Sequence, residues 1–161
     1  LESTIRALTH VQPSVHLVIA GIGKYGALLE TYAQKFHVHS RTSWIGRVHT
    51  QEMIELYQAS DCFVITSPVE TQSIVTLQAI SCGLPVIAAN AGALPELVKN
   101  GENGYLVPAY DDKETGRRMD ELLDPTLRKR MGIKSREISM VHHKPTVLLK
   151  LEEFYTDIVD L

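Results

Sequence analysis

Residues 62–88 read CFVITSPVETQSIVTLQAISCGLPVIA, and this stretch decides the fold class. It begins and ends with two apolar runs, Cys62–Thr66 and Pro85–Ala88, which have the length of buried strands. Between these runs, apolar residues recur at the spacing of one helix face: Ile74, Leu77 and Ile80. A strand, a helix and a second strand in this order predict two parallel strands joined by a crossover helix.

The same alternation continues on both sides of this stretch. Leu17–Ala20 is a further apolar run, and Ser43–Gly46 and Tyr105–Val107 are weaker strand candidates. Strands that are apolar throughout and alternate with helices indicate a parallel sheet covered on both faces. We therefore expect an α/β fold, a doubly wound, Rossmann-like parallel sheet with helices on both faces. Ligands of such folds bind beyond the carboxyl ends of the strands.

The last part of the chain, from about residue 111 to 161, is rich in charge and has no strand pattern. We expect three helices there, with Pro125 and Gly132 as breaks between them. The last predicted helix runs from Pro145 to about Val159. Its apolar residues form one stripe: Val147, Leu148, Leu151, Tyr155 and Ile158. Residues 1–161 are thus read as one domain with a helical C-terminal segment.

Composition excludes several classes of protein. The 161 residues are 44% hydrophobic and 22% charged, which is typical of one globular domain. Sixteen basic and nineteen acidic residues give a formal charge of −3, so we expect no nucleic-acid partner. No apolar run has the length of a membrane span, and the polar start LESTIRALTH does not read as a signal peptide. The two cysteines define neither a disulfide framework nor a metal site, so we expect a cytoplasmic location.

The first glycine-rich loop, Gly21–Gly26, reads G-x-G-x-x-G and follows a predicted strand. Glycines in this pattern let the backbone approach the pyrophosphate of a dinucleotide. The acidic residue that would hold the ribose about 20 positions later is missing, and Arg41 and Arg47 stand there instead. One alternative is therefore an NADP-binding oxidoreductase domain, and another is a strand-to-helix turn without a ligand.

The second loop lies between the strand ending near Thr66 and the helix that contains Ile74. The first turn of a helix has free backbone N–H groups and the positive end of the dipole, so it can bind an anion. Glu70 lies just before this turn. The spacing Ser67-x-x-Glu70 also matches a capping box, in which Glu70 would only close the start of a helix.

The segment Ser67–Val86 resembles the signature of retaining glycosyltransferases of the GT-B fold, group 1 or family 4 type. Their pattern is S-x-x-E, a short turn, a second Glu eight positions after the first, and then A-x-x-x-G-x-P-V. The matching residues are Ser67, Glu70, Ala79, Gly83, Pro85 and Val86. Flanking segments resemble the family as well, namely 44–48, 56–61, 90–98 and 101–107.

This resemblance implies the donor-binding half of an enzyme that moves a hexosyl group from a UDP- or GDP-sugar to a hydroxyl acceptor with retention. It implies no cofactor and no metal ion. Glu70 would be the catalytic residue and would contact sugar hydroxyls, since carboxylates accept charge-assisted hydrogen bonds. The residues implied to bind the donor are Gly21, Gly23, Arg47, Val48, Gln72, Ser73, Ile74, Val75 and Gln78.

Two residues depart from the family pattern. Gln78 stands where the family usually has the carboxylate that holds the ribose, and Ser73 stands at a position that is usually glycine. An amide forms a weaker hydrogen bond than a carboxylate, and a serine adds a Cβ where the backbone approaches the diphosphate. These departures leave a non-catalytic relative as a further alternative.

The resemblance also implies parts that this chain does not contain. Family members open this domain with a central strand and a basic pair, and they carry a separate N-terminal acceptor domain. Leu1 already lies in the helix that should follow the first strand. We therefore expect a domain truncated at its N-terminus and inactive alone, with neighbouring strands that lack a pairing partner. The expected partners are the donor, the acceptor domain and, in the whole protein, the inner face of a membrane.

Overall fold

The computed structural model describes residues 1–159. The strands are β1 (Leu17–Ala20), β2 (Thr42–Gly46), β3 (Phe63–Ile65), β4 (Val86–Ala89) and β5 (Gly104–Val107). The α-helices are α1 (Glu2–Ala7), α2 (Gly26–Lys35), α3 (Thr50–Ala59), α4 (Ile74–Ser81), α5 (Leu94–Leu97), α6 (Asp112–Glu121), α7 (Pro125–Ser139) and α8 (Lys144–Val159). All five apolar runs are therefore strands, and the expected α/β class is confirmed.

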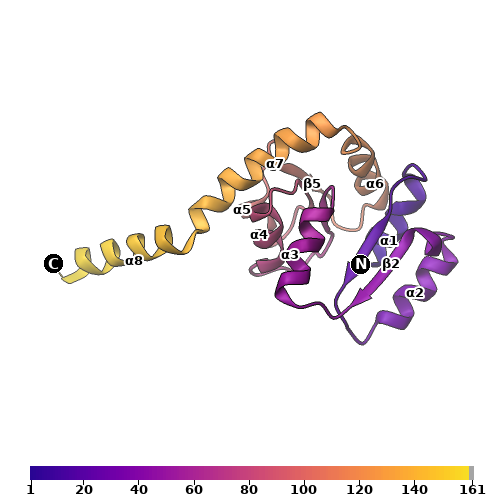
Figure 1. Cartoon of the computed structure of the whole chain (residues 1–161), viewed down its shortest axis with the longest axis horizontal. Coiled ribbons are helices and arrows are strands. Elements are labelled where there is room, and N and C mark those ends of the chain that lie inside the picture. The colour runs from indigo at the N-terminus through magenta and orange to yellow at the C-terminus, as the bar shows by residue number, and fades with distance from the viewer. Residues whose placement is uncertain (160–161) are drawn as a thin grey trace.

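The strands form two parallel sheets instead of one continuous sheet. β1 pairs with β2, and the second sheet has the order β3-β4-β5. Within residues 1–159, β1 and β3 do not pair with each other. In Figure 1 the β1–β2 pair lies with α1 and α2 on one side of the body, and α3, α4 and α5 gather on the other.

β4 is the central strand of the larger sheet, and all four of its residues are buried. Ile87 belongs to a core that also contains Ile5 and Leu8, so it packs on the same side as α1. Val86 and Ala88 belong to a second core on the other side. Burial of both faces explains why the sequence of β4 is apolar throughout instead of alternating.

The first core connects the two sheets. It contains Ile19 of β1 together with Ile87 of β4 and Val107 of β5. Ile5 and Leu8, from α1 and the turn that follows it, are fully buried in the same cluster. α1 and its turn therefore hold together two sheets that share no backbone hydrogen bonds in the described part of the chain.

The expected break at Gly132 is wrong, because α7 runs without interruption from Pro125 to Ser139. Gly132 is needed for packing: a Cβ at this position would overlap the carbonyl oxygen of Gly83, at the end of α4. One turn later, the Ser135 hydroxyl donates a 2.6 Å hydrogen bond to the Leu84 carbonyl. α7 thus lies directly on the backbone that connects α4 to β4.

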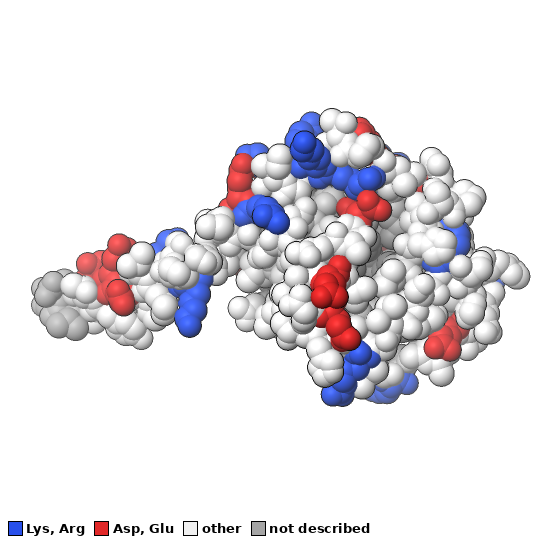
Figure 2. All heavy atoms as spheres, in the orientation of Figure 1, with Lys and Arg blue, Asp and Glu red and all other residues white. Residues whose placement is uncertain are grey.

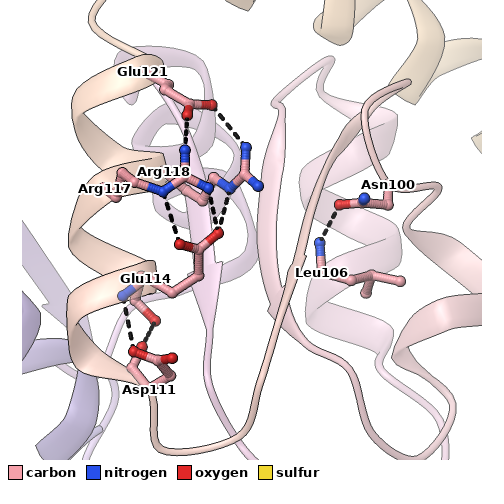
Figure 3. A network of polar contacts seen from close by, with 8 residues as sticks. Asn100, Leu106, Asp111, Glu114, Arg117, Arg118 and Glu121 are labelled. Atoms are coloured by element: carbon pink, nitrogen blue, oxygen red, sulfur yellow. Dashed lines mark hydrogen bonds and ion pairs between the residues drawn. The ribbon is translucent and has the colours of Figure 1, made fainter.

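α6 carries a network of ion pairs, which Figure 3 shows along one side of the helix. Glu114 accepts hydrogen bonds from Arg117 at 2.6 Å and from Arg118 at 2.8 Å. Arg118 also pairs with Glu121 and lies over the ring of Tyr105, 4.1 Å from its centroid. The hydrogen bonds from Arg117 and then Arg118 lower the pKa of Glu114 to about 2.

α8 begins one residue before the predicted Pro145 and projects away from the body (Figure 1). Its predicted apolar stripe is exposed: Val147, Leu148, Leu151, Tyr155 and Ile158. Over the described residues, no helix combines the length and hydropathy that crossing a membrane requires. Figure 2 shows acidic and basic side chains interspersed on the face in view, with basic atoms gathered near the start of α7.

Candidate functional site

The loops after β1 and β2 lie side by side at the carboxyl edge of the smaller sheet. The N–H of Gly21 donates a 2.6 Å hydrogen bond to the carbonyl of Gly46, the last residue of β2. The N–H of Gly26 then donates to the Gly23 carbonyl at 3.1 Å, and α2 begins at this third glycine. Arg47 and Val48 directly follow β2, so four predicted donor-binding residues gather at one sheet edge.

The loop after β3 contains Glu70 and is not the start of a helix. The Ser67 hydroxyl donates to the carbonyl of Val69 at 2.9 Å, which makes a local turn. α4 begins at Ile74, four residues beyond Glu70. The alternative that Ser67 and Glu70 form a capping box is therefore wrong, and the half-buried Glu70 carboxylate is not used to close a helix.

The backbone of Glu70 is held by the loop that follows β4. Its carbonyl accepts a 2.9 Å hydrogen bond from the N–H of Ala93. Gly92 has a φ of +55°, and a Cβ there would overlap the Glu70 carbonyl oxygen. Gly92 and Ala93 are not among the residues predicted from the sequence to form the site. Their only local signal is the glycine itself, which marks a position of unusual backbone conformation or close approach.

The N-terminus of α4 is open to a ligand. Ser73 is the N-cap residue, but within the described chain its side chain forms no capping hydrogen bond. Its hydroxyl lies instead 2.7 Å from the Thr76 hydroxyl, and both side chains are buried. The Ile74 N–H donates to the Gln72 carbonyl at 3.2 Å, and the other N–H groups of the first turn and the positive end of the helix dipole remain available to an anion. Ser73 has a φ of −93°, so the conformation here does not require glycine.

Gln78 lies one turn further along α4 and is exposed. The Tyr57 hydroxyl of α3 donates to the Val75 carbonyl at 3.2 Å and lies 3.5 Å from Oε1 of Gln78. Burial raises the pKa of Tyr57, so the hydroxyl stays protonated and acts as a donor. Tyr57 lies in the segment 56–61 that resembles the family, but nothing in the local sequence signals its contact with α4.

A small pocket of about 110 Å³ adjoins the N-terminus of α4. Three predicted residues line it: Gln72, Ser73 and Ile74. Glu96 of α5 and His142, from the turn before α8, also line it. The turn predicted to hold the diphosphate is thus hollowed, and a carboxylate and an imidazole lie at its border.

A larger cavity of about 620 Å³ lies between the two sheets. Val18 and Ile19 of β1 line one side, and Val64 and Ile65 of β3 line the other. Near the carboxyl ends of the strands its lining includes Ala20, Ser67 and Val75, but not Gly21 or Gly23. The end of β1 and the loop after β3 therefore border one cavity. Burial raises the pKa of Cys62, also in the lining, to about 12.

The structure thus places a carboxylate, an uncapped helix N-terminus and a glycine-rich loop at the carboxyl edge of parallel strands. In residues 1–159 no group of three or more His, Cys, Asp and Glu side chains is placed to hold a metal ion. Parallel α/β folds bind nucleotides and other phosphorylated ligands at this edge. The fold is therefore that of a Rossmann-like α/β domain.

The comparison with known families names the class. The family described as "Glycosyl transferases group 1" matches residues 1–138, so the chain belongs to this family. The similarity to solved GT-B glycosyltransferases agrees with this result. The oxidoreductase alternative, which rested on the G-x-G-x-x-G loop alone, is not retained.

Curated relatives extend well beyond this chain. A GDP-mannose-dependent monoacylated alpha-(1-6)-phosphatidylinositol monomannoside mannosyltransferase from Corynebacterium glutamicum is 34% identical over 138 residues, 80% of this chain and 35% of its own length. A D-inositol 3-phosphate glycosyltransferase from Rhodococcus jostii is 32% identical over 122 residues, 76% of this chain and 26% of its own. The chain therefore spans about a quarter to a third of these proteins.

A solved structure confirms the fold. Sucrose-phosphate synthase from Thermosynechococcus elongatus superposes with a TM-score of 0.88 at 24% identity, covering 99% of this chain and 42% of that one. At this level of identity the likeness speaks for the architecture alone.

Proposed function

We propose that this chain is the donor-binding domain of a glycosyltransferase that moves a hexosyl group from a UDP- or GDP-sugar to a hydroxyl acceptor with retention. The observation that carries the proposal is the position of Glu70, half-buried and just ahead of the uncapped N-terminus of α4. A glycosyl donor presents vicinal hydroxyls and a diphosphate side by side. Glu70 offers a carboxylate for the hydroxyls, and the N-terminus of α4 offers backbone N–H groups for the diphosphate.

Glu70 would orient the sugar by accepting hydrogen bonds from its hydroxyls. The backbone N–H groups of the turn Gln72–Val75 would bind the diphosphate. During transfer the bond between the sugar carbon and the diphosphate oxygen breaks, and negative charge grows on the diphosphate. Fixed N–H dipoles stabilise such charge better than mobile water, because they need no reorientation during the reaction.

The loops after β1 and β2 would hold the rest of the nucleotide. Gly21 and Gly23 offer close backbone approach, and Arg47 and Val48 would contact the base. Gln78 would accept a hydrogen bond from one ribose hydroxyl, and the Tyr57 hydroxyl lies beside its side-chain oxygen. Two proteins similar to this chain support the choice of nucleotide. The Corynebacterium glutamicum mannosyltransferase depends on GDP-mannose by name. Anabaena HepE was solved with UDP; it superposes with a TM-score of 0.85 at 23% identity, covering 99% of this chain and 44% of that one.

The whole protein would also contain a strand between β1 and β3 and an acceptor domain. Two unpaired strand edges and apolar side chains line the cavity between the sheets. α1 begins at the carboxyl edge, where Thr4 contacts Thr66 just after β3. In parallel folds a helix begins where the strand before it ends. A strand in this cavity would therefore connect directly to Leu1.

Calorimetric titration of the whole protein with UDP, GDP, UDP-glucose and GDP-mannose tests the proposed donor site. We expect one nucleoside diphosphate to bind, its sugar form to bind more tightly, and Glu70→Ala to remove this gain. Glu30→Ala is a control, because Glu30 is exposed on α2 and lies outside the predicted site.

Each other result would change the proposal in a defined way. Binding of the diphosphate without any gain from the sugar would remove Glu70 from its assigned role. No binding by any of the four ligands would favour the non-catalytic relative that Gln78 and Ser73 suggest. Retention itself is read from the anomeric configuration of the product by NMR.

A further inference from the structure

We propose that Gly92 and Ala93 position Glu70 and thereby set the preference of the site for the sugar over the bare nucleotide. This inference rests on the proposed function and deepens it. It assigns a role to the loop after β4, which lies more than twenty residues along the chain from Glu70. Gly92 and Ala93 would act through Glu70 and not by contact with the donor, so they are positioning residues.

The backbone of Gly92 lies directly against the backbone of Glu70. A Cβ on Gly92 would overlap the Glu70 carbonyl oxygen and lie 3.1 Å from the Glu70 nitrogen. Contacts this short between a Cβ and backbone atoms force one of the two segments to move. Since Gly92 also has a φ of +55°, an L-amino acid would be strained there as well.

The next residue adds a hydrogen bond. The N–H of Ala93 donates to the Glu70 carbonyl at 2.9 Å. Ala93 is the N-cap residue of α5, so its position is coupled to the buried side chains of Leu94 and Leu97. This hydrogen bond therefore connects the loop between β3 and α4 to α5, which packs in the second core.

The loop after β4 is itself anchored to the sheet. The N–H of Asn90 donates a 2.7 Å hydrogen bond to the carbonyl of Val107, the last residue of β5. Leu94 is fully buried in the same core as β4. Gly92 and Ala93 thus fix the backbone of Glu70 relative to the larger sheet.

The Glu70 side chain depends on this support. Among residues 1–159 its carboxylate has no hydrogen-bond or ion-pair partner that would hold it, so its direction follows from its backbone. A shift of the Glu70 backbone would move the carboxylate away from the sugar. Of the turn that would bind the diphosphate, Ile74 and Val75 belong to α4 and would stay in place. The inference therefore predicts loss of sugar binding without loss of diphosphate binding.

The test compares Gly92→Ala with Gly101→Ala in the whole protein. Gly101 also has a positive φ, +82°, but a Cβ there would meet no atom within 4 Å. The two variants thus share the backbone strain, and only Gly92→Ala presses on Glu70. The measurements are melting temperature and calorimetric affinity for UDP and UDP-glucose, or for GDP and GDP-mannose, whichever pair the wild type binds.

We expect Gly92→Ala to reduce the ratio of sugar-nucleotide affinity to nucleotide affinity about tenfold, the worth of one hydrogen bond to a charged group. Affinity for the nucleotide alone should stay within about twofold, and Gly101→Ala should leave the ratio unchanged. In a Glu70→Ala background, Gly92→Ala should have no further effect on the ratio. That result would distinguish positioning of Glu70 from a general loss of structure.

If Gly92→Ala does not fold, Ala93→Pro takes its place. Proline removes the N–H that donates to the Glu70 carbonyl and places its Cδ against that oxygen, so it also displaces the Glu70 backbone, and the φ of −82° at Ala93 lies near the proline range. An unchanged ratio in a folded variant would overturn the positioning role while leaving the proposed donor site intact. A wild-type protein that binds the nucleotide but gains nothing from the sugar would overturn the positioning role and would also remove Glu70 from its role in the proposed function. The wild-type titration therefore separates the two failures.

Discussion

The hydroxyl oxygens of Thr4 and Thr66 lie 2.8 Å apart, and both side chains are buried. Thr4 belongs to α1, and Thr66 directly follows β3 at the start of the loop that carries Glu70. This hydrogen bond therefore connects the first helix to the edge of the larger sheet at the candidate site. It crosses the place where the two sheets share no strand pairing.

Valine at both positions should destabilise the protein by less than the sum of the two single substitutions. Thr66→Val has nearly the same shape but leaves the Thr4 hydroxyl buried without a partner, at a cost of about 1–2 kcal/mol. Thr4→Val should cost a similar amount. The double variant removes both hydroxyls, so its loss should be smaller than the sum of the two. Urea unfolding of the four proteins measures this difference, and strictly additive losses would contradict it.

A second prediction concerns Gly132, in the middle of α7. Replacing a helical glycine by alanine normally stabilises a helix by about 1 kcal/mol. Here we expect the opposite, because the new Cβ would overlap the Gly83 carbonyl and push α7 away from the turn before β4. The expected loss is about 1–3 kcal/mol, as for other overpacked sites. Thermal unfolding of Gly132→Ala measures it.

Lys129→Ala is the matched control for this substitution, since Lys129 is exposed on the same helix. It should change stability by less than about 0.5 kcal/mol. A melting temperature of Gly132→Ala above that of the wild type would show that α7 does not lie as close to Gly83 as described.

Features that depend on a short stretch of sequence were predictable, and contacts between residues far apart in the chain were not. β1, β3 and β4 were predictable because each is a short apolar run, and burial of both faces requires that pattern in β4. The segments of β2 and β5 were weaker candidates. The interpretation of Gly132 as a break failed because the carbonyl that excludes a Cβ is far away in the chain. Ser67 and Glu70 were ambiguous for a similar reason. Their spacing suits a capping box, and only the start of α4 at Ile74 decides against it.

In the candidate site too, contiguous motifs were predictable and contacts between different elements were not. The order of motifs in the sequence indicated Glu70 and the turn before α4, because those features are contiguous. The contacts of Gly92 with Glu70 and of Tyr57 with Gln78 each join two different elements. No periodicity or local motif encodes such a contact, so they became visible only in the fold.

A third prediction follows from the pKa of Glu114. Its folded value of about 2 lies below the value of about 4.3 for an unfolded glutamate. The ionised form is therefore favoured by folding, and its stabilisation is present above about pH 4.3 and is lost as the pH falls toward 2. Glu114→Gln should lower the free energy of unfolding at pH 7 by up to about 1 kcal/mol, because Arg117 is largely exposed to solvent.

Urea unfolding of this variant and the wild type between pH 7 and pH 2.5 provides the measurement. The difference between the two proteins should shrink steadily below about pH 4.3. Glu30→Gln is the control, since Glu30 is an exposed residue of α2 that forms no ion pair within the described residues. A difference for Glu114→Gln that stays constant down to pH 2.5 would contradict the assigned pKa.

The last prediction concerns Gln78, which replaces the carboxylate that the family resemblance implies. In the proposed site Gln78 accepts a hydrogen bond from a ribose hydroxyl. The Tyr57 hydroxyl lies 3.5 Å from Oε1 of Gln78. A hydrogen bond to a charged acceptor contributes about 1 kcal/mol more than one to a neutral amide. Gln78→Glu should therefore tighten binding of the nucleoside diphosphate about fivefold. Calorimetric titration of the whole protein measures this gain.

The 2′-deoxy form of the same nucleotide shows whether the gain comes from the ribose. If the new carboxylate accepts the ribose hydroxyl, the deoxynucleotide should bind the wild type and Gln78→Glu with similar affinity. An equal gain for both nucleotides would place the effect elsewhere, for example on α4 itself. Weaker binding of both would mean that the added charge repels the diphosphate and that position 78 faces the phosphates. Tyr57→Phe should reduce the gain, because Glu at position 78 would lose the neighbouring donor that orients its carboxylate.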